Sequence, residues 1–232
     1  MPETFPIPDF HLLQKRLRVY FIRHGESEGN SQGILQGRQD YPLSELGREQ
    51  CRAAATYLAD RGIEHVLTSP LLRARETADI IASAAGLPQP VDNGNLVELD
   101  TGLFTGMTIR EIEREYPAEW SAFHRDSWEA VPDAESIASL WGRAISVWNE
   151  IIETANQGPR HILAVTHGGL LQWIIKTSLG ARPQWLPLMS TANCGIFEFL
   201  AHPVPQQEQN NAPPASADRA YYGSWITINA SA

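Results

Sequence analysis

Short apolar runs alternate with segments of helical periodicity along this 232-residue chain. The clearest run is 17–22, in which Val, Tyr, Phe and Ile follow one another, and similar runs lie within 65–69 and 160–169. Continuous runs rich in β-branched and aromatic residues are typical of strands that are buried on both faces of a parallel sheet. The pattern therefore predicts strands of a mainly parallel sheet, with helices between them.

Capping residues and glycines mark where the helices begin and end. Ser44 is placed to cap a helix that runs to about Arg61, where Gly62 ends it. A second helix is predicted to have Pro70 in its first turn and to stop at Gly86. Three more helices are predicted farther along, at Ile109–Tyr116, Ala118–Ser127 and Glu135–Thr154.

These elements predict an α/β fold, a three-layer sandwich with helices on both faces of the sheet. We expect one domain over 1–232, with the helical segment of about 107–156 forming a cap over the site. Alternating residues predict further strands at 193–200 and 221–228. The intervening segment, about 202–218, is rich in Pro, Gln, Asn and Ala, and its composition predicts a flexible surface loop.

Chemically useful side chains stand where three of the predicted strands end. Arg23 and His24 follow the first run, and His167 follows the run within 160–169. Arg73 lies just after the third strand, in the first turns of the next helix. The carboxyl ends of parallel strands meet at one rim, where open α/β sheets hold their ligands. Two histidines and two arginines at one rim indicate a site for an anion.

The chain resembles the histidine phosphatase superfamily, which includes the cofactor-dependent phosphoglycerate mutases. The resemblance rests on four motifs in order, spread over residues 17 to about 200. They are Arg23-His24-Gly25-Glu26-Ser27 with Asn30, Gln36 and Gly37; Ser69-Pro70-Leu71-Leu72-Arg73-Ala74; Leu96-Val97-Glu98 with Gly102 and Gly106; and Val165-Thr166-His167-Gly168-Gly169.

The resemblance implies a role for each matched residue. His24 would be the nucleophile that is transiently phosphorylated, and Glu98 would be the proton donor. The phosphoryl oxygens would be bound by Arg23, Asn30, Arg73, His167 and Gly168, and the rest of the substrate would reach Gln36 and Gly37. No metal and no cofactor are expected.

The residue types suit this chemistry. A phosphoryl group in transfer carries negative charge on its equatorial oxygens, which fixed guanidinium groups stabilise. His24 must attack through an unprotonated nitrogen, so its other nitrogen should donate to a backbone carbonyl. Glu98 would protonate the leaving oxygen and then activate water.

Three functions stay open from the sequence. A phosphatase of a small phosphorylated metabolite, such as a sugar phosphate or a phosphoglycerate derivative, is favoured over a mutase. Mutases of the family have an arginine after the glutamate, whereas Leu99 follows Glu98 here, and residues 99–109 hold no basic side chain. Four arginines could still serve a second anionic group: Arg38, Arg110, Arg114 and Arg125. The third function is an inactive module that binds a phosphorylated ligand or protein.

The composition restricts the kinds of partner and the location that we expect. A formal net charge of −9 disfavours nucleic acid and anionic membranes. Cys51 and Cys194 are too few and too distant in sequence for a disulfide framework or a zinc site, which predicts reduced structural thiols. No signal peptide or membrane-spanning run is evident, so a cytoplasmic location is the default expectation. Monomer and homodimer both stay open.

Overall fold

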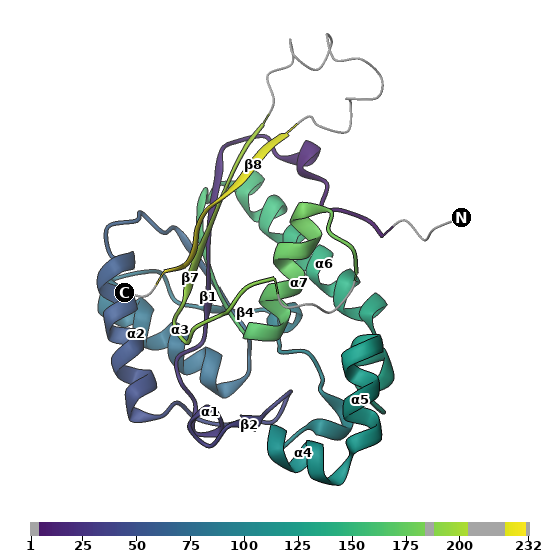
Figure 1. The fold of residues 1–232 in the computed structure, drawn as a ribbon. Coiled ribbons are helices and arrows are strands. Elements are labelled where there is room, and N and C mark those ends of the chain that lie inside the picture. Colours follow the sequence, from purple (N-terminus) through teal and green to yellow (C-terminus); the bar gives the residue numbers. More distant parts are fainter. Residues whose placement is uncertain (1–4, 184–187, 204–220, 231–232) are drawn as a thin grey trace.

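A six-stranded mixed sheet forms the centre of the protein (Figure 1). The structure is a computed structural model that describes residues 5–183, 188–203 and 221–230. The strand order is β4-β3-β6-β1-β7-β8. The first four strands in this order run parallel, whereas β7 is antiparallel to both β1 and β8. The bounds are β1 (Leu17–Arg23), β3 (His65–Thr68), β4 (Val91–Asp92), β6 (His161–Thr166), β7 (Ile196–Pro203) and β8 (Tyr221–Ala230).

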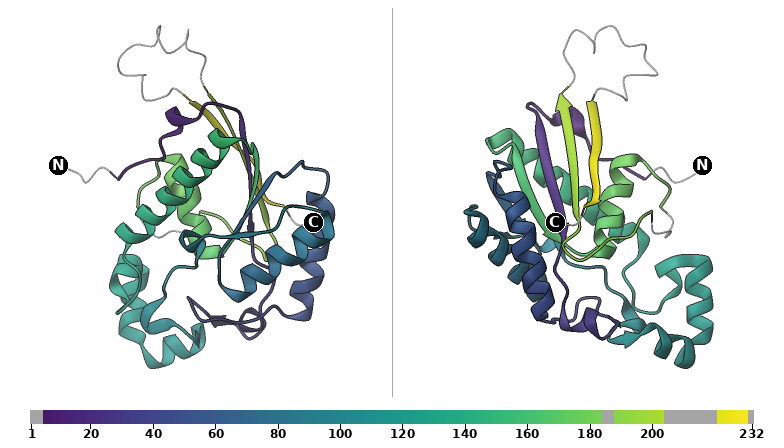
Figure 2. Two further views of the ribbon diagram at one scale, coloured as in Figure 1. Left: turned by 180° about the vertical axis from the view of Figure 1, so that it is seen from behind. Right: turned by 60° about the vertical axis from the view of Figure 1, so that its left-hand side comes forward.

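Helices cover both faces of this sheet. The left view of Figure 2 shows α6 and α7 on one side and α2 and α3 on the other. The described residues form seven α-helices, which confirms the predicted α/β class. Their bounds are α1 (Glu28–Ser31), α2 (Glu45–Leu58), α3 (Leu72–Ala85), α4 (Ile109–Glu115), α5 (Pro117–Asp126), α6 (Ile137–Gln157) and α7 (Gly168–Leu179).

Strand β1 contributes to the core on both faces, as its apolar run predicts. Val19 and Phe21 belong to the core shared with α6 and α7, where the Phe21 ring meets Trp148 edge-on at 5.3 Å between centroids. Tyr20 and Ile22 point to the other side, into the core shared with α2 and α3. Burial of both sets of side chains fixes the register of β1 and therefore the position of its carboxyl end.

The ends of the first long helices follow the predicted signals only in part. Helix α2 was predicted to run to about Arg61 and to end at Gly62, but it ends at Leu58 with Ala59 as its C-cap. The Ser44 hydroxyl accepts the Gly47 N–H at 3.0 Å and caps α2. Gly86 ends α3 in the left-handed conformation, with φ of 66°. Pro70 was predicted in the first turn of α3, but α3 starts at Leu72 with Leu71 as its N-cap. Pro70 therefore belongs to the connection between β3 and α3.

The helical segment expected as a cap divides into two parts. Helices α4 and α5 and the short 3-10 helix η4 (Ser127–Ala130) lie beyond the sheet, as Figure 1 shows. Helix α6 instead packs along α7, with its apolar face in the core of the sheet. Short strands β2 (Ile34–Leu35) and β5 (Met107–Thr108) pair with each other, and β5 leads directly into α4.

Both cysteines are free and buried, and the fold brings them together. The Sγ atoms of Cys51 and Cys194 lie 3.7 Å apart.

Of the expected loop at 202–218, His202 and Pro203 belong to β7, and the rest lies outside the described residues. None of the helices described is long and apolar enough to cross a membrane. The single-domain organisation over 1–232 stays a prediction.

Candidate active site

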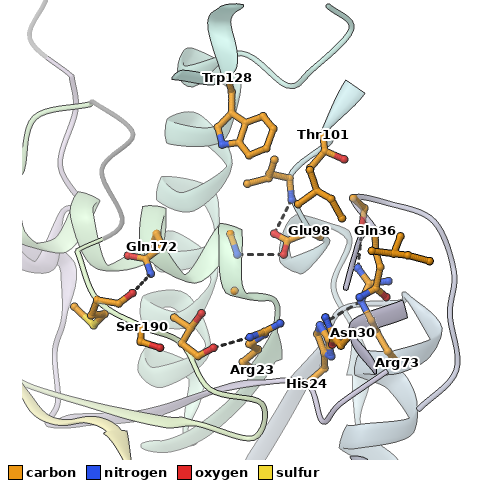
Figure 3. Close-up of a pocket in the computed structure, with 18 residues that line it drawn as sticks. Arg23, His24, Asn30, Gln36, Arg73, Glu98, Thr101, Trp128, Gln172 and Ser190 are labelled. Carbon is orange, nitrogen blue, oxygen red and sulfur yellow. Dashed lines mark hydrogen bonds between the residues drawn. The ribbon is translucent and has the colours of Figure 1, made fainter. Parts of the chain in front are cut away.

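A cavity of about 410 Å³ opens at the carboxyl ends of β1 and β6 (Figure 3). It is lined by all of the predicted site residues except His167: Arg23, His24, Asn30, Gln36, Gly37, Arg73, Glu98 and Gly168. These residues come from segments as distant in sequence as 23–37 and 168. The fold therefore assembles the candidate site that the strand ends predict.

His24 is held as a neutral imidazole with one nitrogen facing the site. Its Nδ1 lies 2.6 Å from the Gly25 carbonyl oxygen, which can only accept, so Nδ1 carries the proton. Burial lowers the pKa of His24 well below its usual value, and the charges of Arg23 and Arg73 lower it further. Nε2 consequently keeps its lone pair, and it accepts the Arg73 Nε–H at 3.2 Å.

The guanidinium of Arg73 is fixed on every side. Besides His24, it donates Nη1–H to the Gln39 carbonyl and Nη2–H to the Gly37 carbonyl, both at 2.8 Å. Only 1% of Arg73 is exposed. The two backbone carbonyls fix this cation in place before an anion arrives, which favours strong electrostatic stabilisation.

Arg23 is fixed by a residue that the sequence did not indicate. Its Nη1–H donates to the Thr191 carbonyl at 2.6 Å, while its buried Nε has no hydrogen-bond partner among the described residues. Asn193, also unpredicted, donates its Nδ2–H to the His24 carbonyl and the Asn30 Oδ1, each at 3.2 Å. The segment just before β7 therefore holds Arg23, His24 and Asn30 in place through hydrogen bonds.

His167 lies behind His24 and does not line the cavity. Its ring centroid is 5.1 Å from that of His24, and its Nε2 is 2.8 Å from the Ser69 hydroxyl. Burial lowers its pKa well below the usual value, with Arg73 and His24 adding to the effect. Its buried Nδ1 has no partner in the described part of the chain. The ring is therefore a neutral neighbour of His24.

Glu98 is anchored at the amino end of α7. Its Oε1 accepts the N–H groups of Leu99 at 2.9 Å and Leu170 at 3.0 Å, and its Oε2 accepts the Gly169 N–H at 3.1 Å. The amino end of a helix is a favourable place for a carboxylate. A Cβ on Gly169 would come within 2.6 Å of Glu98 Oε1, so this close approach requires glycine.

Behind Glu98, Arg143 of α6 holds the chain that carries the carboxylate. Its Nη1 donates to the carbonyls of Asn95 and Val97, at 3.1 and 2.5 Å. Its Nε and Nη2 donate to the two carboxylate oxygens of Glu135, at 3.0 and 2.6 Å. Both side chains of this pair are at most 10% exposed. No sequence motif indicated Arg143, which lies 45 residues after Glu98.

The part of the cavity away from His24 is largely apolar. It is lined by Ile34, Leu35, Leu99, Trp128 and Met189, with Thr101, Gln172 and Ser190 as the polar additions. Gln172 fixes the wall beside it, because its Nε2–H donates to the Met189 carbonyl at 2.7 Å and its Oε1 accepts the Leu188 N–H at 3.0 Å. None of the four arginines expected near a second anionic group lines the cavity: Arg38, Arg110, Arg114 and Arg125.

The geometry suits the binding of a phosphoryl group next to a nucleophile. A neutral imidazole that is unprotonated at Nε2 lies beside two fixed guanidinium groups, and a carboxyl group faces the same cavity. In the described part of the chain, no group of three or more His, Cys, Asp or Glu side chains could hold a metal ion. The fold and the site thus define an α/β protein of the phosphoryl-transfer type.

The chain belongs to the histidine phosphatase superfamily (branch 1), whose family model matches residues 19–204. One relative is the "Probable phosphoglycerate mutase GpmB" of Yersinia enterocolitica. It is 34% identical to this chain over 185 residues, which is 78% of this chain and 83% of that protein. A "2-carboxy-D-arabinitol-1-phosphatase" from Triticum aestivum is 28% identical over 206 residues, 87% of this chain and 40% of that protein.

Solved structures give the same family. The "mycobacterial glucosyl-3-phosphoglycerate phosphatase" superposes with a TM-score of 0.75 at 26% identity, covering 94% of this chain and all of that one. A structure named "Mycobacterial hydrolase 1" gives a TM-score of 0.78 at 26% identity, again over 94% of this chain and 100% of that chain. The relatives therefore include both phosphatases and a mutase by name.

Proposed function

We propose that the protein is a phosphomonoesterase that acts on a small phosphorylated metabolite through a phosphohistidine intermediate. The observation that carries this proposal is the state of His24, a neutral imidazole beside Arg23 and Arg73 that is unprotonated at Nε2, where it accepts the Arg73 Nε–H. A nucleophile of this kind divides one difficult displacement into two easier ones.

In the first step, His24 Nε2 forms a bond to phosphorus as the ester P–O bond breaks. The leaving alcohol oxygen takes a proton from Glu98. Arg23 and Arg73 stabilise the charge on the equatorial oxygens during transfer. The Arg23 Nε, which has no partner among the described residues, is a further donor for these oxygens.

In the second step, water replaces the alcohol. Glu98, now a carboxylate, takes a proton from a water molecule whose oxygen attacks phosphorus and breaks the P–N bond. Inorganic phosphate leaves and His24 returns to its neutral form. Asn30, Gln36, Gly37 and Gly168 line the cavity around these groups and complete the proposed binding site.

The test of this proposal is hydrolysis of p-nitrophenyl phosphate. The wild-type protein should release phosphate, and His24→Ala should lose essentially all of the activity. His11→Ala, at an exposed position outside the site, is the matched control and should keep it. Equal activity in His24→Ala and wild type would overturn the proposal. If the wild type and both variants were all inactive, a binding module would be favoured instead.

Mutase activity is the second candidate, because the Yersinia relative is named a probable phosphoglycerate mutase. Incubation with 3-phosphoglycerate separates the two reactions, since a phosphatase yields inorganic phosphate and a mutase yields the 2-phospho isomer. We expect phosphate as the main product. An excess of isomer over phosphate would establish the mutase instead.

A further inference from the structure

The cations of the site are all at the phosphate end of the cavity. Among the described residues that line it, the only Lys or Arg side chains are Arg23 and Arg73, beside His24. Arg73 directs its Nη1 and Nη2 to backbone carbonyls, and Arg23 directs its Nη1 to the Thr191 carbonyl. Neither guanidinium group can leave these partners without cost, so neither extends to the far end.

Arg38, which follows the cavity-lining Gly37 in the sequence, is occupied as well. Arg38 donates to Glu135 at 3.0 Å and to the Glu98 carbonyl at 3.3 Å, and its Nη1 lies 4.0 Å from Asp100. Its charge is therefore balanced by carboxylates outside the cavity. A substrate carboxylate at the far end would meet Glu98 and, among the described residues that line the cavity, no free cation. An unpaired charge in a partly desolvated site is unfavourable.

What the far end offers instead is apolar area. Figure 3 shows the Trp128 indole on the opposite side of Glu98 from His24. Trp128 is only 4% exposed, and its ring packs at 4.7 Å between centroids on Phe123 of α5, so its position is fixed by the cap. Leu99, Leu35 and Met189 also line the cavity and add to its apolar surface.

From this separation of charge and apolar surface we infer the substrate class: a phosphate ester of an uncharged alcohol with an apolar face that packs on Trp128. The inference rests on the proposed phosphatase function and deepens it. The volume of about 410 Å³ lies toward the lower end of ligand pockets, about 300–1,000 Å³, so the alcohol is small. Ser190, which is exposed on the cavity wall, could bind a hydroxyl group of this alcohol.

The test compares three esters of primary alcohols, so that leaving-group chemistry changes little. These are 2-phenylethyl phosphate (apolar), sn-glycerol 3-phosphate (uncharged and polar) and 3-phosphoglycerate (a carboxylate). We expect kcat/KM to fall in this order, by about tenfold or more from the first ester to the last, a difference typical of hydrophobic pockets. A preference for 3-phosphoglycerate would overturn the inference.

Two pairs of variants test which residues determine the preference among these esters. Trp128→Leu should lower kcat/KM for 2-phenylethyl phosphate about tenfold while changing glycerol 3-phosphate less than threefold. Trp128→Phe, which keeps an aromatic face, should retain most of the activity. Ser190→Arg adds a cation at an exposed position of the cavity wall and should raise kcat/KM for 3-phosphoglycerate about tenfold, whereas Ser190→Gln should not.

The outcomes separate the two proposals. If His24→Ala hydrolyses all three esters as well as wild type does, the phosphatase proposal fails and the substrate class with it. If hydrolysis depends on His24 but Trp128→Leu alters all three esters equally, only the substrate class fails. Unchanged use of 3-phosphoglycerate by Ser190→Arg would also contradict the charge argument.

Discussion

Replacement of Arg143 by methionine tests whether the buried ion pair behind the candidate acid stabilises the fold. Methionine keeps much of the length of the side chain but removes all of its donors. The carbonyls of Asn95 and Val97 and both oxygens of Glu135 lose the bonds that Arg143 supplies. The segment that these bonds hold leads directly to Glu98.

The magnitude follows from burial. Removing one partner of a buried ion pair typically costs about 3–5 kcal/mol, because the other charge stays buried without compensation. Here Arg38, itself 44% exposed, still lies 3.0 Å from Glu135 and compensates part of the charge. We therefore expect a loss of about 3 kcal/mol, a large fraction of a typical total of about 5–15 kcal/mol.

Urea unfolding of four proteins measures this loss: wild type, Arg143→Met, Glu135→Gln and the double variant. The double variant should be more stable than Arg143→Met alone, since no uncompensated carboxylate remains buried. A loss below about 1 kcal/mol in Arg143→Met, or a double variant no more stable than the single one, would refute the reasoning.

The stability that the Arg143–Glu135 pair contributes should also depend on pH. Burial raises the pKa of Glu135, but its hydrogen bonds and attraction to Arg143 outweigh burial and leave the pKa below its usual value of 4.5. A depressed folded-state pKa gives stability that is present above the unfolded value and is lost as pH falls through the folded value. The stability difference between wild type and Arg143→Met should therefore shrink as pH falls below 4.5.

Three further predictions follow from the site and the core. In steady-state assays, Glu98→Gln should lower kcat about 10²–10⁴-fold for alkyl phosphates. The loss should be smaller for p-nitrophenyl phosphate, because its leaving group needs little protonation. The control Glu28→Gln, at an exposed position, should match wild type. Nitrogen-15 NMR should show His24 as the Nδ1–H tautomer with no titration near pH 6.5, since its pKa is well below that value; a cationic ring at pH 6.5 would contradict this. Gly47→Ala should destabilise the fold by about 1–3 kcal/mol in urea unfolding, because a Cβ there would lie 2.0 Å from the Glu26 carbonyl oxygen; an unchanged midpoint would count against this packing.

The sequence predicted the parts of the site that local patterns determine. Arg23 and His24 follow a continuous apolar run, and such a run has one register in a sheet that is buried on both faces. The position of Arg73 follows from the connection between β3 and α3. The Gly25 carbonyl that orients His24 is adjacent in sequence, so its role could be expected from the chemistry.

Contacts between distant segments could not be predicted in this way. Thr191 and Asn193 reach Arg23 and His24 across more than 160 residues, through the antiparallel pairing of β1 with β7. Neither residue type signals such a role in a loop. Trp128 packs on Phe123 of α5, and its place in the cavity wall depends on tertiary contacts that no local pattern shows.

The measurement that tests the central claim most directly is rapid alkaline quench of the enzyme during turnover, followed by mass spectrometry of its peptides. The account predicts a phosphoryl group on the imidazole of His24, absent before substrate is added and lost as substrate is exhausted. Turnover with no such adduct, or with the phosphoryl group on another residue, would contradict it.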